Sequence, residues 1–320
     1  MSESNELTFG LPIDEPMESI NTESLNLEGS ESTINNEEQK IKGLSKEEYN
    51  DPNQIRVTIT DDEAPLIILF GPPACGKTMT LVRLARYLNK QGYKISPIRN
   101  FRPSNDKNYE EICEPANFNK IINSPDAANS TSNISFMLVE VLKNGKRLCQ
   151  ILESPGEHLF DPQKPTKPFP TYVNNIIHCN NRKLWTIMVE PNWKDVVDRN
   201  NYVARIKELS LQMDRKDRAL FIYNMIDKTN FVRGKGDVNI PEAHKDVSKN
   251  YPGIFEIFRN QNPITKWWRD YNCGFIPFST GTYTDTTKQD SKGNTVKNYQ
   301  EGADYYPQML WNEIKKIIIG

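Results

Sequence analysis

Residues 71–78 combine glycines, a lysine and a threonine at a spacing that suits phosphate chemistry. They read Gly-Pro-Pro-Ala-Cys-Gly-Lys-Thr. In such a loop the glycines let backbone N–H groups converge on phosphate oxygens, Lys77 supplies a cation to the outer phosphates, and Thr78 offers its hydroxyl to Mg²⁺. We therefore predict that the loop binds a nucleotide and that Lys77 also serves in catalysis. The predicted nucleotide contacts here are Gly71, Pro72, Pro73, Ala74, Cys75, Gly76, Lys77, Thr78 and Met79.

The segments on either side of the loop have the periodicity that this chemistry requires. Residues 64–70 form a short continuous apolar run, as a buried parallel strand does. Residues 79–87 carry apolar side chains at helical spacing. A helix that begins here would place about half a positive charge beside the phosphates. The sequence thus predicts strand, glycine loop and helix in that order.

Strand and helix patterns continue along the chain. Residues 135–142 and 147–153 are apolar runs on either side of an Asn-Gly turn, which predicts a hairpin. Later strands are expected at 184–190, 219–224 and 274–278, with helices at 202–213, 243–258 and 306–318. This alternation predicts an α/β fold of three layers, a P-loop NTPase fold with a mostly parallel sheet, one antiparallel hairpin strand and helices on both faces.

Ligands of such sheets bind at the carboxyl ends of the strands, so the residues just past each strand are candidates for the site. Residues 153–158, Glu-Ser-Pro-Gly-Glu-His, follow the hairpin. Residues 224–227, Asn-Met-Ile-Asp, and 279–281, Ser-Thr-Gly, follow the last two strands.

In type and order, these elements resemble the Ras-like and translational P-loop GTPases over residues 65 to about 318. The resemblance implies that Glu153 holds Mg²⁺ through water and that the Gly156 N–H contacts the γ-phosphate. It implies that Asn224 and Asp227 belong to the guanine-binding element, with Asp227 accepting hydrogen bonds from guanine N1 and N2. It also implies backbone contacts to guanine O6 from Ser279, Thr280 and Gly281.

The resemblance also implies a threonine that completes the Mg²⁺ shell. Thr131 lies 22 residues before Glu153, the span of a loop exit and two hairpin strands, and is the candidate, with Ser130 and Ser132 beside it.

In these GTPases the residue after the second-motif glycine orients the attacking water. Here that residue is Glu157, followed by His158. We expect His158 to serve, because a neutral imidazole accepts a hydrogen bond from water, with Glu157 as the other candidate. Arg99, Arg102 or a partner protein would supply the arginine that neutralises charge in the transition state.

We expect a GTP-binding protein that uses Mg²⁺ with GTP or GDP, either a slow GTPase forming GDP and phosphate or a nucleotide-dependent switch that signals to a protein partner. Three departures from the GTPase pattern keep alternatives open: Glu153 replaces an aspartate, Met225 a lysine, and Gly281 a residue that packs under guanine. The alternatives are an ATP-hydrolysing P-loop enzyme and a nucleotide-binding scaffold without turnover.

Composition divides the chain near residue 55. Thirteen of the 42 acidic residues, but only three of the 40 basic ones, fall within residues 1–53. Residues 1–55 also show no sustained apolar period, so we expect a disordered acidic tail. Residues 56–320 would form the GTPase-like domain, with insertions near 95–133 and 282–300.

The chain has no run apolar enough to span a bilayer, and its polar start lacks the features of a signal peptide. Its five cysteines are scattered and suit reduced thiols. We therefore expect a cytoplasmic protein without a membrane span, and we predict no nucleic-acid partner. The acidic tail and altered base motif are similar to those of divergent bacterial GTPases of the kind found in defence systems.

Overall fold

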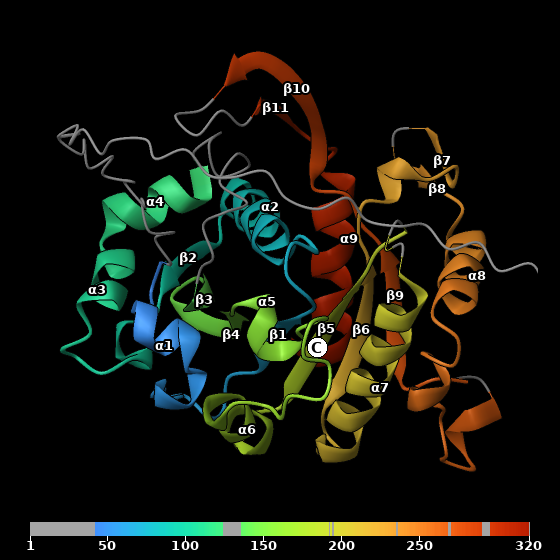
Figure 1. Ribbon diagram of the computed structural model, residues 1–320, viewed down its shortest axis with the longest axis horizontal. Helices are drawn as coiled ribbons and strands as arrows, with labels where there is room; N and C mark the ends of the chain where they lie inside the picture. The colour runs from blue at the N-terminus through green and yellow to red at the C-terminus, as the bar shows by residue number, and fades with distance from the viewer. Residues whose placement is uncertain are drawn as a thin grey trace, which may run out of the picture. The chain divides into compact units, whose positions relative to one another are not determined.

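The computed structural model describes residues 42–123, 136–191, 193, 195–234, 236–267, 270–289 and 295–319 (Figure 1). At its centre is a seven-stranded sheet in the order β2-β3-β4-β1-β5-β6-β9. The strands are β2 (Lys94–Pro97), β3 (Met137–Lys143), β4 (Lys146–Glu153), β1 (Leu66–Phe70), β5 (Lys183–Val189), β6 (Arg218–Tyr223) and β9 (Cys273–Pro277). Strand β1 is parallel to β4 and β5, and β6 and β9 continue in parallel, whereas β3 is antiparallel to both β2 and β4.

Helices cover the two faces of this sheet (Figure 1). They are α1 (Lys46–Asn50), α2 (Lys77–Lys90), α3 (Lys107–Cys113), α4 (Pro115–Asn123), α5 (Gly156–Leu159), α6 (Thr171–His178), α7 (Val196–Gln212), α8 (Ile240–Asn250) and α9 (Tyr305–Ile314). Two small hairpins lie outside the sheet, formed by β7 (Val232–Gly234) with β8 (Asp237–Val238) and by β10 (Gly281–Gln289) with β11 (Thr295–Glu301). The expected α/β fold with one antiparallel hairpin strand is confirmed.

The side chains of β1 alternate between two layers of the core, because successive residues of a strand point to opposite faces. Ile67 and Leu69 share one interior space with residues of α2 and α9. Phe70 points the other way, and its ring stacks on Tyr202 of α7 with 6.1 Å between ring centroids. Since β1 is buried on both faces, every residue of it is apolar.

The expected helix at 243–258 is shorter in the structure. Helix α8 ends at Asn250 and is followed by Tyr251-Pro252-Gly253. A residue before proline disfavours the helical conformation, and Gly253 has a φ of 81° that ends the turn. Phe255 and Phe258 still pack on Phe221 of β6, so the apolar pattern reports burial rather than helix here.

Residues 42–55 differ from the disordered tail that we expected up to residue 55. Leu44 and Ile55 are each only 3% exposed and belong to the core. Helix α1 begins with a capping box between Ser45 and Glu48, and Glu48 forms an ion pair with buried Arg102. Composition suggested a tail because these apolar residues are few, yet each one is buried. Residues 1–41 lie outside the described residues, and the division into tail and domain stays a prediction for them.

The two expected insertions contain regular structure. Residues 94–123 supply edge strand β2 and helices α3 and α4, while residues 124–135 lie outside the described part. The later insertion is the β10–β11 hairpin. No described helix is long and apolar enough to cross a membrane.

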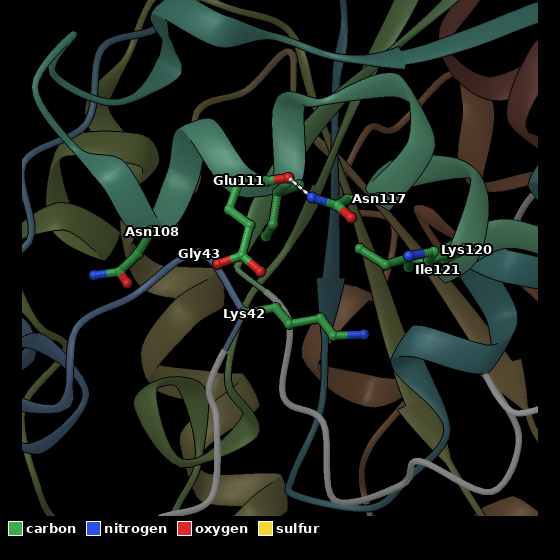
Figure 2. A pocket seen from close by; sticks show the side chains of 8 residues that line it. Lys42, Gly43, Asn108, Glu111, Asn117, Lys120 and Ile121 are labelled. Atoms are coloured by element: carbon green, nitrogen blue, oxygen red, sulfur yellow. Dashed lines mark hydrogen bonds between the residues drawn. The ribbon is translucent and has the colours of Figure 1, made fainter.

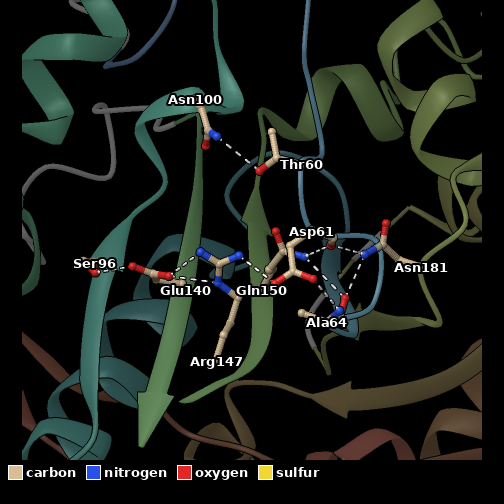
Figure 3. A network of polar contacts seen from close by, with 9 residues as sticks. All are labelled: Thr60, Asp61, Ala64, Ser96, Asn100, Glu140, Arg147, Gln150 and Asn181. Carbon is tan, nitrogen blue, oxygen red and sulfur yellow. Dashed lines mark hydrogen bonds and ion pairs between the residues drawn. The ribbon is translucent and has the colours of Figure 1, made fainter. Parts of the chain in front are cut away.

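A polar network holds the segment that enters β1 (Figure 3). The Arg147 guanidinium lies between Asp61 and Glu140, with N–O distances of 2.7 Å to each carboxylate. The side-chain amides of Gln150 and Asn181 both donate to the Asp61 carbonyl at 2.8 Å. The network therefore fixes the amino end of β1 to its neighbouring strands, opposite the end that carries the glycine loop.

The burial of Leu44 gives a stability prediction. We expect Leu44→Ala to lower the free energy of unfolding by about 2–5 kcal/mol, the usual cost of truncating a buried leucine. Leu211→Ala is the control, because Leu211 is 78% exposed on α7, and it should change stability by less than about 0.5 kcal/mol. Urea denaturation measures both. Equal small effects would show that residues 42–55 do not pack on the domain.

Candidate nucleotide-binding site

The glycine loop joins β1 to α2 in a conformation that needs its glycines. Gly76 has a φ of 91°, in the left-handed region, and a Cβ at that position would lie 2.2 Å from the Asn224 side-chain nitrogen. Helix α2 begins at Lys77, so its unpaired N–H groups and positive dipole end are at the loop. The loop therefore has the local geometry of a phosphate cradle.

Lys77 bends back over this loop. Lys77 is only 5% exposed. Its ammonium donates to the carbonyls of Gly71 at 3.1 Å and Pro72 at 2.9 Å. An ammonium has three N–H donors, so one is left for a phosphate oxygen. A buried cation without a full set of partners favours an anion beside it.

Thr78 and Glu153 meet across two neighbouring strands. The Thr78 hydroxyl donates to Glu153 Oε1 at 2.7 Å, and Glu153 Oε2 is buried with no hydrogen-bond partner among the described residues. Burial raises the pKa of Glu153 to about 7, although the Lys77 charge and the Thr78 hydrogen bond oppose the shift. A hydroxyl and a carboxylate oxygen at this spacing, beside a phosphate loop, fit the ligand preferences of Mg²⁺.

The second motif packs directly on the loop. Gly156 begins helix α5, and a Cβ there would lie 2.3 Å from the backbone nitrogen of Pro73 and 2.4 Å from the carbonyl carbon of Pro72. Only glycine allows this approach. The Gly156 backbone is therefore held directly against the glycine loop.

The two elements that were predicted to bind the base are joined to the loop and to each other. The Asn224 side-chain amide donates to the Cys75 carbonyl at 2.9 Å. The Ile226 N–H donates to the Phe278 carbonyl at 3.1 Å, which places the exposed Asp227 beside the element formed by residues 279–281. Within that element Ser279 and Thr280 are buried and Gly281 has a φ of 144°. The structure thus brings together the glycine loop, the residues after β6 and the residues after β9, and the Thr78 to Glu153 contact brings the end of β4 to the same loop.

His158 is buried beside this edge, with both ring nitrogens engaged. Nε2 lies 3.2 Å from the Tyr49 carbonyl and Nδ1 lies 3.1 Å from the Tyr172 hydroxyl. Because a carbonyl only accepts, Nε2 carries the proton and Nδ1 accepts from Tyr172. Burial lowers the pKa of His158 to about 4, so the ring is neutral. In this conformation His158 is tied to its neighbours rather than directed at a water, and its catalytic role stays a prediction.

Glu157 is partly exposed and lies near Tyr49 of the segment before the sheet. Burial raises the pKa of Tyr49 to about 12, and the Glu157 carboxylate adds to this shift by its charge and by a hydrogen bond. Glu157 is therefore also held by the N-terminal segment, which sequence patterns did not connect to the site.

The other expected residues are placed as follows. Thr131 lies outside the described residues. Arg99 forms ion pairs with Glu110 and Glu114, and Arg102 is buried against Glu48 and Asp106. Arg99 thus binds two carboxylates of the insertion, whereas Arg102 binds one of the insertion and one of the N-terminal segment.

Glu190 is an acidic residue at a strand end that lies outside the motifs resembling those of GTPases. It follows β5 at the same edge, and its charge acts on the thiol of Cys75 in the glycine loop. Burial raises the pKa of Glu190 itself, while Lys228 opposes that shift. In the sequence, its position at the end of the apolar run 184–190 could have marked Glu190 as a candidate site residue.

A separate pocket lies between the N-terminal segment and helices α3 and α4 (Figure 2). Within its wall the Asn117 side-chain amide donates to the Glu111 carbonyl at 2.9 Å. None of the predicted site residues lines it. The lining residues are Lys42, Gly43, Asn108, Glu111, Ile112, Asn117, Lys120 and Ile121.

No protein-family model and no curated protein sequence matches the chain. Among solved structures, the chain is similar to the GTPase-like domain of Ski7 from S. cerevisiae bound to GTP, at 12% identity over 81% of this chain and 51% of that chain, with a TM-score of 0.38. It is similar to Roco2 RocCORdC from Methanosarcina barkeri bound to GDP, at 12% identity over 82% and 51% of the two chains and a TM-score of 0.31. A nucleolar GTP-binding protein 1 from Plasmodium falciparum gives 13% identity over 70% and 80%, with a TM-score of 0.30.

The chain spans about half the length of several of these solved structures, including the Ski7 and Roco2 chains. These neighbours are GTP-binding or GTPase-like domains.

The pKa of His158 predicts how stability depends on pH. The unfolded histidine titrates near 6.5 and the folded one at about 4, so the unfolded state takes up a proton first as the pH falls. The stabilisation is therefore complete above pH 6.5 and is lost towards pH 4, by about 2 kcal/mol between pH 7 and pH 5.

Urea unfolding of wild type and His158→Gln at these two pH values measures this contribution. The variant should lose less stability between pH 7 and pH 5 than the wild type does, while His178 and His244 contribute equally to both. The same loss in both proteins would mean that the His158 ring is not buried in its neutral form.

Proposed function

We propose that this chain binds a guanine nucleotide with Mg²⁺ and hydrolyses GTP slowly to GDP and phosphate, as a switch that acts on a protein partner. The observation that carries the proposal is the contact between Thr78 and Glu153 at 2.7 Å, made beside the buried ammonium of Lys77. A hydroxyl, a carboxylate and a cation converge there on the end of a glycine loop. This combination suits a triphosphate and its metal better than it suits a structural role.

The residues would divide the work as follows. Backbone N–H groups of residues 74–78 and the free N–H of Lys77 would hold the phosphate oxygens. Thr78 and deprotonated Glu153 would hold Mg²⁺, Glu153 through water. When bound, Mg²⁺ supplies positive charge against the charge that develops on the phosphate oxygens. The orphaned Oε2 of Glu153 supports this role, since a buried carboxylate oxygen without a partner is costly unless a cation or water meets it.

Asp227 would select the base. A carboxylate can accept from guanine N1–H and the N2 amino group, whereas adenine has neither donor there and would leave the charge unpaired. The support for this role is the Ile226 to Phe278 hydrogen bond, which sets Asp227 next to Ser279, Thr280 and Gly281.

Slow turnover is proposed because the candidate groups for orienting water are constrained. His158 must leave its hydrogen bonds with Tyr49 and Tyr172 before it can accept from water. Glu157 would bring a negative charge towards the phosphates. Either route predicts weak transition-state stabilisation without a partner.

The partner itself is proposed from the two insertions, residues 94–123 and the β10–β11 hairpin, because inserted segments on a rigid scaffold commonly carry partner contacts.

A scaffold that binds nucleotide without turnover is the second candidate, and the engaged His158 ring favours it. Release of inorganic phosphate from GTP over hours separates the two: a slow GTPase releases phosphate in proportion to enzyme, and Lys77→Ala abolishes that release. No release above buffer by the wild type would favour the scaffold.

The phosphate half of the proposal is tested with Lys77. GTP and Mg²⁺ at about 100 times the Kd should stabilise the wild-type protein by roughly 2.7 kcal/mol. Lys77→Ala should remove this stabilisation, because the ammonium that faces the phosphates is gone. Lys90→Ala, at the exposed end of the same helix, is the matched control and should keep it. Thermal unfolding with and without ligand is the measurement, and full stabilisation of Lys77→Ala would overturn the phosphate-loop assignment.

The base half is tested with Asp227. GTP and GDP should bind at least about tenfold tighter than ATP, a difference of roughly 1.4 kcal/mol. Asp227→Asn should shift the preference towards xanthosine nucleotides, whose extra carbonyl accepts from the new amide. Competition binding with GTP, ATP and xanthosine triphosphate measures the preferences. Equal affinities for GTP and ATP, unchanged in Asp227→Asn, would favour the ATPase or scaffold alternative.

A further inference from the structure

The β10–β11 hairpin grows directly out of the third base element. Its pairing begins at Gly281 with Glu301 and continues through Tyr283 with Tyr299. A Cβ at position 281 would lie 2.3 Å from the Gln300 carbonyl oxygen, so the two strands touch at the element itself. The start of the hairpin therefore cannot move without moving residues 279–281.

Tyr283 is the first aromatic side chain of this hairpin and lies beside the base elements. Its hydroxyl is 3.5 Å from the Thr280 hydroxyl, and its ring centroid is 5.1 Å from that of Tyr299. The Tyr299 hydroxyl donates to the Thr280 carbonyl at 2.7 Å, which fixes the pair to the element. Burial raises the pKa of Tyr283, and the negative charge of Asp227 raises it further. The two side chains are therefore close enough for the charge of one to act on the other.

The end of β11 and the residues that follow it are bound to α2, the helix that follows the glycine loop. Arg83 of α2 is fully buried and forms an ion pair with Glu301. Its guanidinium also donates to the carbonyls of Gly302 at 2.8 Å and Ala303 at 3.3 Å. Because α2 begins at Lys77, the same helix anchors the phosphate cradle and the hairpin that carries Tyr283.

We propose that Tyr283 is a nucleotide-contacting residue whose ring forms a wall of the base pocket, held in place by Tyr299 and by the Arg83 to Glu301 contact. The inference rests on the proposed nucleotide binding. The hairpin lies at the insertion expected near residues 282–300 of the GTPase-like domain, and Met225 replaces the lysine expected to cover the base. An aromatic ring from β10 supplies a surface for that base.

Contact of an aromatic ring with a base is tolerant of base identity, because every base has a π-face, and truncating such a ring to alanine weakens binding about tenfold or more. Tyr283 would thus contribute affinity for guanine and adenine nucleotides alike, while Asp227 discriminates between them. A ligand without a base would not depend on Tyr283.

The test compares GDP, ADP and inorganic tripolyphosphate, each with Mg²⁺, by calorimetric titration. Tyr283→Ala should weaken GDP and ADP by about tenfold or more and leave tripolyphosphate unchanged. Tyr283→Phe should retain GDP affinity within about threefold, since the ring remains. Tyr271→Ala is the matched control, because Tyr271 is a partly buried tyrosine that precedes β9 and donates a hydrogen bond to Glu256. It should leave the affinities for all three ligands unchanged.

Unchanged GDP affinity in Tyr283→Ala would overturn the proposal, and so would an equal loss for GDP and tripolyphosphate, which would indicate general damage. If Tyr283→Ala does not fold, Tyr283→Leu fills the space without a π-face and should show the same selective loss. If the proposed nucleotide binding itself is wrong, the result is different, because the wild type would then bind neither GDP nor tripolyphosphate.

Discussion

The adjacency of β1 and β4 is the constraint on which the site depends. The two strands run in parallel with Ile68 opposite Leu152, so the next residues along each strand reach the same edge of the sheet. Thr78 lies in the first turn of α2, which follows β1, and Glu153 is the last residue of β4; their side chains meet at 2.7 Å. A shift of one residue in that register would turn Glu153 to the other face. The polar network around Asp61 and Arg147 secures the opposite end of the same strands.

Side-chain contacts among the described residues connect the elements proposed to bind the base with the elements proposed to bind phosphate. Asn224 reaches the Cys75 carbonyl, and Arg83 reaches the base of the β10–β11 hairpin from α2. Both contacts run between an element that would hold phosphate and one that would hold the base. If the proposed function holds, these contacts would let the occupation of one half restrict the other.

The elements of the candidate site could be predicted from sequence because each is recognisable beside its own strand. These elements are the glycine loop, the acid at the end of β4 and the polar ends of β6 and β9. Contacts between distant residues were not predictable in this way. His158 meets the carbonyl of Tyr49, 109 residues earlier, and Arg83 meets Gly302, 219 residues later. Residues 42–55 pack through Leu44 and Ile55, two apolar residues that an acidic composition obscures.

We proposed that Thr78 and Glu153 hold Mg²⁺ against a bound nucleotide, and the coupling between Mg²⁺ binding and GTP binding is the most direct test of that role. Calorimetric titration of GTP with and without Mg²⁺, in wild type and Glu153→Gln, gives that coupling. We expect Mg²⁺ to strengthen GTP binding by about tenfold or more in the wild type, and Glu153→Gln to lose most of this gain while keeping its Mg²⁺-free affinity. An equal gain in both proteins, or none in the wild type, would contradict the proposed Mg²⁺ site.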